Sequence, residues 1–427
     1  MPFGFYIIMA AQFFSSLADN ALLIAAISLL LQLFAPEWMT PMLKFVFTVS
    51  YVLFAAVVGA FADSMPKGKV MFITNTIKIV GCIMILTHEW WSVPGFDDYA
   101  TILTGYAVVG FGAAAYSPAK YGILTEYLPH HKLVVANGWI EGLTVLSIIL
   151  GTLLGGALVS EAVSNRLIAI DIPHIDSAGE AAIIVIACLY LIAAVFNLFI
   201  PDTGVDHKMV SRNPVYLIRE FTHCVKLLWT DKLGQISLAT TTLFWGAGAT
   251  LQFIVIKWAE VTLDYSLSQA SYLQGVCAAG IAMGAVCAAK FVPLNKAVNV
   301  IPMGIAMGVI VMAMIVATSV WAAVPLIIAI GALAGFFVVP MNALLQHRGH
   351  ILMGAGHSIA VQNFNENLSI LTMLAIYALL ISLDLSIYIV IAMFGSFVAG
   401  TMWLVRMRHL YNLKQGPLPE IPAGASH

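Results

Sequence analysis

The chain has few charged side chains: only 9% of its 427 residues are Asp, Glu, Lys or Arg. Its formal net charge is -2, so it lacks the basic surplus with which nucleic-acid-binding proteins contact phosphates. The cysteines are five, an odd number, and four of them lie in apolar runs without CxxC or Cys/His spacing, which gives no support to a disulfide framework or a metal site: Cys82, Cys188, Cys277 and Cys287. We therefore expect no nucleic-acid partner, no metal and no cofactor.

Motifs of hydrolytic and phosphoryl-transfer enzymes are missing as well. The sequence contains no P-loop GxxxxGK[ST], no HExxH and no nucleophile elbow at a strand-to-helix turn. These absences argue against an ATP-driven pump and against an intramembrane hydrolase. The protein is not expected to be an enzyme.

Apolar residues are abundant: 61% of the chain is hydrophobic and the mean hydropathy is +0.95, outside the range of soluble proteins. A membrane-spanning helix needs about 20 apolar residues to cross about 30 Å of hydrocarbon, and twelve stretches meet this requirement. We predict an all-α membrane protein with two six-helix pseudo-repeats. The predicted parts are an N-terminal half, a cytoplasmic linker, a C-terminal half and a cytoplasmic tail, at 1–200, 201–234, 235–405 and 406–427.

The distribution of basic residues predicts the orientation. Most of the 19 Lys and Arg residues fall on one side of the predicted helices, as the positive-inside rule describes for cytoplasmic loops, so both termini are predicted to be cytoplasmic. An internal repeat supports the two halves: Glu141–Leu146 matches Glu366–Leu371, and Gly110-Phe111 matches Gly335-Phe336 at the same offset.

Three acids fall inside predicted spans: Asp19, Glu141 and Glu366. An ionisable side chain in a bilayer costs a few kcal/mol or more, so such residues usually face a cavity and have a function. We interpret Asp19, its neighbour Asn20 and the two glutamates as parts of a substrate path. The alternative is that they form hydrogen bonds between helices and only hold the bundle together.

The predicted eleventh helix carries an unusual density of amides around Glu366. Gln362 and Asn363 precede this acid by four and three residues, so the three side chains share one helix face. This face can line a polar path. A packed polar seam between helices is the alternative.

Several lysines are candidates for binding an anionic headgroup. Lys120 follows Pro118, which is expected to break or kink the helix, and it can either meet a phosphate or extend to the membrane surface. Gln252 and Lys257 in the seventh predicted helix can receive a headgroup from outside, although Lys257 is also typical of a helix-end residue. Two further lysines are interpreted as anchors: Lys44 and Lys78.

The loop after the second predicted helix combines Gly59, Asp63, Lys67 and Lys69 in a tight turn. A carboxylate and two cations in this position suit a latch that forms and breaks as the two halves move. An ordinary positive-inside loop is the alternative.

This loop and the twelve spans resemble the major facilitator superfamily, whose second-to-third loop carries Gly-x-x-x-Asp followed by basic residues. More specific segments resemble the bacterial lysophospholipid transporter family. These segments are Ala11–Phe13 with Asp19–Leu22, Ala113–Ile123, Phe336–Gln346, and Ala360–Asn363 with Glu366-Asn367.

The resemblance implies that lysophosphatidylethanolamine and related lysolipids move from the outer to the inner leaflet of a Gram-negative inner membrane by alternating access. It implies a cytoplasmic acyltransferase/acyl-carrier-protein synthetase as a possible partner, surrounding membrane lipid, and a monomer. Two alternatives remain open. One is a proton-coupled multidrug or small-solute exporter of the same fold, and the other is a non-transporting scaffold for an acyltransferase.

Carried over by position, Asp19, Asn20 and Lys120 match polar residues of the family, and Asn342 and Gln346 fall within a matching segment. One position departs from the pattern. Relatives carry an arginine where this chain has Gln252, so an ionic gate between that position and Asp19 is in doubt. We consider Lys257 as a substitute for the missing arginine.

Overall fold

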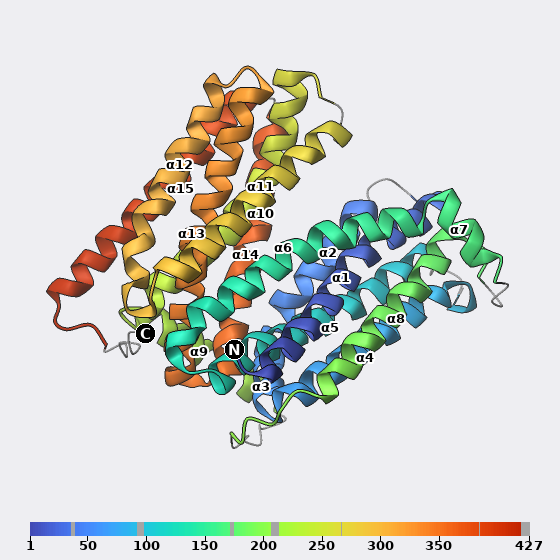
Figure 1. Cartoon of the computed structure of the whole chain (residues 1–427), viewed down its shortest axis with the longest axis horizontal. Coiled ribbons are helices and arrows are strands. Elements are labelled where there is room, and N and C mark those ends of the chain that lie inside the picture. Colours follow the sequence, from blue (N-terminus) through green and yellow to red (C-terminus); the bar gives the residue numbers. More distant parts are fainter. Residues whose placement is uncertain are drawn as a thin grey trace. The chain divides into compact units, whose positions relative to one another are not determined.

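The structure is a computed structural model of the whole chain (Figure 1). It describes residues 1–35, 39–91, 98–170, 175–205, 213–265, 267–383 and 385–419. Every regular element in these ranges is a helix, which confirms the predicted all-α class.

The helices fall before and after a long polar connection. Those before it are α1 Phe3–Gln32, α2 Met39–Leu53, α3 Ala55–Asp63, α4 Lys67–Leu86, η1 His88–Trp91, α5 Asp98–Tyr127, η2 His130–Lys132, α6 Leu133–Leu158, α7 Glu161–Ile168 and α8 Ala178–Leu198. Those in and after it are α9 Pro214–Thr230, α10 Gly234–Leu263, α11 Leu267–Phe291, η3 Leu294–Val300, α12 Ile301–Ala313, η4 Met314–Val316, α13 Val320–Met353, α14 Ala355–Ser382 and α15 Ile387–Lys414.

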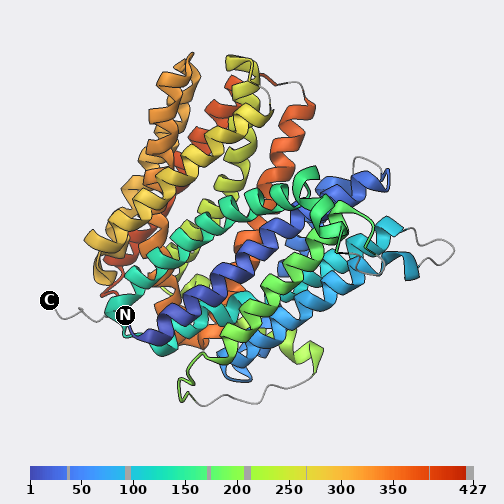
Figure 2. The same cartoon turned by 45° about the vertical axis from the view of Figure 1, so that its right-hand side comes forward.

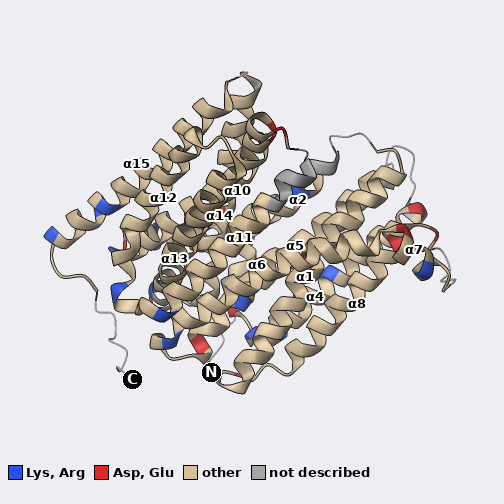
Figure 3. Cartoon of the chain, turned by 45° about the horizontal axis from the view of Figure 1, so that its top comes forward, with Lys and Arg blue, Asp and Glu red and all other residues tan. Residues whose placement is uncertain are grey.

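Eleven helical segments in the described ranges are long and apolar enough to cross a membrane, and a bent pair raises the number to 12 if it forms one span. The pair is Met42–Leu53 and Ala55–Asp63, which meet at 62°. Figure 3 shows that the long helices carry few charges along their middles. The prediction of a multi-pass membrane protein is therefore confirmed.

The expected break at Pro118 is not found, because α5 is one continuous helix with this proline inside it. Proline removes one backbone N–H from the helix, and in membrane proteins neighbouring helices and side chains re-satisfy the freed carbonyl. Lys120 consequently lies within α5 rather than beyond its end.

The chain packs as two compact units. The first comprises Met1–Glu126, Leu146–Phe221 and Ala355–Asn363, and the second comprises Tyr127–Val145, Thr222–Gly354 and Phe364–His427. Helices α6, α9 and α14 each begin in one unit and continue in the other, and α5 ends at Tyr127, the first residue of the second unit. The division into residues 1–200 and 235–405 stays a prediction about the two sequence halves.

In the first unit, α1 and α4 each pack along α8, as Figures 1 and 2 show. A buried apolar core that includes Leu22, Leu29 and Ile186 holds these helices together. α4 and α5 approach through two glycines: a Cβ on Gly81 would lie 2.7 Å from the carbonyl oxygen of Gly105. Small residues drive such close helix packing in lipid, where hydrophobic attraction between helices is weak.

The second unit follows the same rule. α11 packs along α13, and α12 packs along α15. Gly308 of α12 and Gly395 of α15 face each other, and a Cβ on either residue would lie 2.8 Å from the carbonyl oxygen of the other. Side-chain size at these two positions therefore sets the α12–α15 distance.

Candidate functional site

A buried ion pair lies in the middle of the first unit. The Nζ of Lys78 on α4 lies 2.8 Å and 2.9 Å from the two carboxylate oxygens of Asp19 on α1. Tyr190 on α8 donates a hydrogen bond of 2.7 Å to Oδ1 of Asp19. Three helices thus converge on one carboxylate.

The lysine end of this pair is completely enclosed. Lys78 Nζ also donates to the Oγ of Ser15 at 3.0 Å, and Ser15 donates to Oδ1 of Asn75 at 2.8 Å. The ammonium lies 5.1 Å and 5.3 Å from the ring centroids of Tyr116 and Tyr190, within cation–π range. We call Ser15, Asp19, Asn75, Lys78 and Tyr190 the Asp19 cluster.

The two charges differ in exposure. The Lys78 side chain is 1% exposed, whereas the Asp19 side chain is 20% exposed. All three ammonium protons already have acceptors, while the carboxylate presents one edge outside the cluster. The cluster can therefore offer a polar acceptor to a solute without leaving a bare charge in the bilayer.

The structure corrects the interpretation of Lys78 as a membrane anchor. An anchor extends its ammonium to water, but Lys78 is enclosed and neutralises Asp19. The sequence contained a signal: Thr74, Asn75 and Lys78 place three polar groups at helical spacing inside an apolar span. Asn20 does not join the cluster, because its side-chain amide donates to the carbonyl of Ser16 on its own helix.

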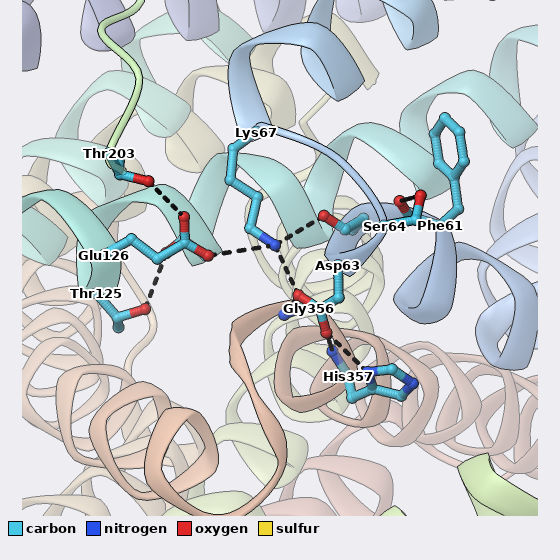
Figure 4. A network of polar contacts seen from close by, with 11 residues as sticks. Phe61, Asp63, Ser64, Lys67, Thr125, Glu126, Thr203, Gly356 and His357 are labelled. Atoms are coloured by element: carbon cyan, nitrogen blue, oxygen red, sulfur yellow. Dashed lines mark hydrogen bonds and ion pairs between the residues drawn. The ribbon is translucent and has the colours of Figure 1, made fainter. Parts of the chain in front are cut away.

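A second polar site joins α3, α4 and the start of α14 (Figure 4). The carboxylate of Asp63 accepts hydrogen bonds from the backbone N–H groups of Gly356 at 2.7 Å and His357 at 3.0 Å. Unpaired N–H groups at a helix start favour a negative charge, so Asp63 caps α14. The His357 ring adds a contact of 2.7 Å from Nδ1 to Oδ2 of Asp63.

Lys67 connects this capping carboxylate to α5. Its Nζ lies 2.6 Å from Oδ1 of Asp63 and 3.4 Å from Oε1 of Glu126, and its side chain is 1% exposed. Gly59 permits the close approach, because a Cβ there would lie 2.7 Å from the Cβ of Ala360. We call Asp63, Lys67, Glu126, Gly356 and His357 the Asp63 network. The exposed Lys69 is not one of its members.

Two amide contacts accompany these charged sites. Within the second unit, Asn137 of α6 and Gln346 of α13 exchange two hydrogen bonds, of 3.0 Å and 2.9 Å, in a reciprocal pair. Within the first unit, the Nδ2 of Asn363 donates to the Oγ of Ser117 at 2.9 Å. Sequence reasoning selected Gln346 and Asn363 but missed both of their partners.

The remaining predicted site residues differ in environment. Gln362, Glu366 and Asn342 are buried, as a polar seam or path requires. Lys120 is half-buried, with Nζ 4.3 Å from the ring centroid of Tyr121. Glu141 lies on α6, but its side chain is outside the described part.

Neither Gln252, at the position of the missing arginine, nor Lys257, its proposed substitute, is among the residues of the two sites described above. Gln252 is exposed. Lys257 pairs with Glu260 at 3.0 Å, and both side chains are largely exposed at 42% and 59%. Exposed pairs of this kind contribute little to stability. In the structure, the countercharge of Asp19 is Lys78 rather than Lys257.

The turn between α9 and α10 contains an ion pair that sequence reasoning missed. Arg348 of α13 donates to Asp231 from Nη2 at 2.7 Å and from Nε at 3.2 Å. Burial raises the pKa of this carboxyl, but the bonds from Arg348 and from the backbone N–H groups of Gly234 and Leu233 outweigh burial. The net effect is a lowered pKa for Asp231.

Comparison with known proteins gives concordant results. A family model described as "Major Facilitator Superfamily" matches residues 8–371. A protein named "Lysophospholipid transporter LplT" from Photorhabdus laumondii is 38% identical over 93% of this chain and 94% of its own. The protein of the same name from Klebsiella pneumoniae is 41% identical over 89% of each chain.

Solved structures share the fold at much lower sequence identity. A bacterial homologue of the iron transporter ferroportin, in an outward-facing state, gives a TM-score of 0.73 at 10% identity, covering 97% of this chain and 100% of its own. The Escherichia coli fucose:proton symporter gives 0.71 at 9% identity, covering 95% and 98%. These likenesses concern the fold alone.

Proposed function

Because the chain belongs to the major facilitator superfamily and to its family of bacterial lysophospholipid transporters, we propose that it moves a lysophospholipid across the membrane. The site observation that carries this proposal is the Asp19 cluster, a charge-balanced polar group in the middle of an apolar unit. The proposed substrates are lysophosphatidylethanolamine and related lysolipids.

The different requirements of the headgroup and the acyl chain favour a single-chain lipid as the substrate. Moving a zwitterionic or anionic headgroup through hydrocarbon without partners is prohibitive, so the protein must supply polar groups along its route. The acyl chain has no such requirement, because it can remain in an apolar groove or in lipid. Asp19 with Tyr190, and the buried amides of α14, are the groups that we propose escort the headgroup.

We place the protein in the inner membrane of a Gram-negative bacterium, with both termini in the cytoplasm. The distribution of Lys and Arg along the sequence supports this orientation. In this orientation, transport from the outer to the inner leaflet would deliver lysolipid to a cytoplasmic acyltransferase/acyl-carrier-protein synthetase. We expect alternating access by a monomer, with the Asp63 network as a cytoplasmic latch.

Reconstitution tests the proposal directly. Purified protein in liposomes should accelerate transfer of labelled lysophosphatidylethanolamine between leaflets, and a diacyl phospholipid and a cationic drug serve as control substrates. Selective transfer of the lysolipid is the expected result. Transfer of the drug alone would overturn the proposed substrate. If the folded protein transfers none of the three compounds, the non-transporting scaffold is favoured.

A proton-coupled exporter remains the second candidate on one observation, the buried acid Glu366 on α14. Asp19 is a poorer candidate for this role, because the ammonium of Lys78 already balances its charge. Transport that follows an imposed pH gradient and is lost in Glu366→Gln would support the exporter. Lysolipid transfer independent of the gradient would exclude coupling.

A further inference from the structure

The ring of His357 lies between two carboxylates from different helices. Its Nδ1 is 2.7 Å from Oδ2 of Asp63 on α3, and its Nε2 is 3.9 Å from Oε2 of Glu220 on α9. All three residues belong to the first unit. The Glu220 oxygen is buried and accepts no hydrogen bond from the described residues.

The partners of Asp63 determine which ring nitrogen carries a proton. Asp63 accepts hydrogen bonds from two backbone N–H groups and from Lys67, as an ionised carboxylate does. The close contact at Nδ1 of His357 therefore requires an N–H there, because two acceptors would repel each other at 2.7 Å. In a neutral ring, Nε2 then presents a lone pair to Glu220.

We propose that Nε2 of His357 and Oε2 of Glu220 share one bound proton. This proton stabilises the contact between α9 and the first turn of α14. With the proton in place, the ring donates to both carboxylates and the 3.9 Å gap can close to a hydrogen bond. Without the proton, two acceptors face each other across the gap. The buried Glu220 oxygen then has no donor.

Charged groups surround the gap between His357 and Glu220. Among the described residues, Lys67 pairs with the carboxylates of Asp63 and Glu126, whereas Glu220 lies opposite His357. Lys67 is already engaged by Asp63 and Glu126. Of the other titratable groups near Glu220 on α9, Arg219 and His223 are exposed and Cys224 is buried.

The proton gives the α9–α14 contact a defined dependence on pH. The contact is stabilised at low pH, when the proton is bound. This stabilisation is lost as the pH rises and the proton leaves. Imidazoles in general change charge between about pH 5 and 8, within the physiological range. The pH would thus change the stability of the contact between α9 and the first turn of α14, whatever solute the protein carries.

Thiol labelling tests this site in the full-length protein. Cys224 lies one turn after Glu220 on α9 and is buried. In a background in which the other four cysteines are alanine, its maleimide labelling rate is measured in nanodiscs at pH 6 and pH 8. Each rate is divided by that of a short cysteine peptide at the same pH, which removes the effect of thiolate formation.

We expect the normalised rate to rise at least about threefold from pH 6 to pH 8, a ratio that corresponds to about 0.65 kcal/mol at RT ≈ 0.59 kcal/mol. Glu220→Gln supplies a non-titrating N–H to Nε2, so it should label slowly at both pH values. His357→Gln should remove the pH dependence. His223→Gln, an exposed histidine on the same helix, should retain the wild-type profile.

Two results would overturn the proposal: an unchanged normalised rate in the wild-type background, or a wild-type pH profile in Glu220→Gln. If the alanine background does not fold, thermal unfolding of the unmodified chain at the two pH values replaces labelling, with the same variants. The proposal is then overturned by a melting temperature that is the same at pH 6 and pH 8, or by a wild-type pH dependence in Glu220→Gln. Neither readout involves transport. Failure here would therefore leave the proposed function unaffected.

Discussion

The ammonium of Lys78 and the carboxylate of Asp19 form one electrostatic unit, with Nζ 2.8 Å and 2.9 Å from the two oxygens. This relationship changes what a substitution of Asp19 measures. Removing the acid alone leaves a lysine that is 1% exposed without its countercharge. A loss of transport in such a variant can then reflect a loss of folded protein.

We therefore predict that Asp19→Asn lowers the free energy of unfolding by about 3 kcal/mol, the lower end of the range for breaking a buried pair. The double variant Asp19→Asn with Lys78→Met should recover most of this stability, because it buries no unpaired charge. Thermal unfolding of purified protein measures both. Equal destabilisation of the single and double variants would show that the pair is not coupled.

The same double variant separates structure from transport. If Asp19 contacts the headgroup, the stable double variant should still fail to transfer lysolipid in proteoliposomes. Full transfer by that variant would remove both residues from the substrate path.

Two tyrosines beside Lys78 provide a matched comparison. Tyr190 donates a hydrogen bond to Asp19, whereas the hydroxyl of Tyr116 finds no partner among the described residues. Tyr190→Phe should cost about 1.5–3 kcal/mol, as expected for a hydrogen bond to a charged group, and Tyr116→Phe should be close to neutral. Both variants keep the ring over the ammonium, so equal melting temperatures would contradict the assigned hydrogen bond.

The reciprocal amide pair of Asn137 and Gln346 predicts strong coupling between the two positions. Asn137→Ala should cost about 1–3 kcal/mol, because it leaves a buried carboxamide without its partner. Replacing both residues by leucine should cost less than the sum of the two single leucine changes. A double-mutant cycle from thermal unfolding gives the coupling energy, and additive effects would contradict the prediction.

Much of the fold follows from the sequence, because lipid leaves the backbone few choices: each apolar run must be a helix long enough to cross. The segment with Gly59 and Asp63 was recognisable because its Gly-x-x-x-Asp pattern is informative by itself, but both residues lie in helix α3 rather than in the predicted tight turn. The 62° bend between α2 and α3 was not predicted. No proline marks it, and the sequence there is as apolar as on either side.

The partners of the buried polar groups were much harder to predict. Lys78 and Asp19 are separated by 59 positions, and Asn137 and Gln346 by 209. In so apolar a chain, periodicity does not reveal which face of a helix is interior, so a lysine inside a span can equally be an anchor or a countercharge. Only the packing of α1 and α4 against α8 decides between them.

Substitution of Gly59 tests the close contact between α3 and α14. Gly59→Ala should destabilise the protein by about 1–3 kcal/mol, because the new methyl group would lie 2.7 Å from the Cβ of Ala360. The helical Gly142 is the control: a Cβ there meets nothing within 4 Å, so alanine should be neutral or slightly stabilising. Equal effects of the two substitutions on thermal unfolding would contradict the close contact.

The ion pair of Asp231 and Arg348 predicts a loss of stability in acid. Because the pKa of Asp231 is lowered in the folded protein, its contribution is present above the unfolded value of about 3.9. That contribution is lost as the pH falls through the lower, folded value. Asp231→Asn should therefore lower the melting temperature at pH 7, and the difference from wild type should shrink below about pH 4.

Glu260→Gln provides the control for this experiment, because it also removes one carboxylate from an ion pair, but from the exposed pair with Lys257. Exposed pairs contribute at most about 1 kcal/mol, so this variant should unfold nearly as the wild type does at both pH values. A constant difference between Asp231→Asn and wild type from pH 7 to pH 3 would mean that the charge of Asp231 does not stabilise the fold. The difference would then come from the hydrogen bonds, because asparagine offers Arg348 one acceptor oxygen where aspartate offers two.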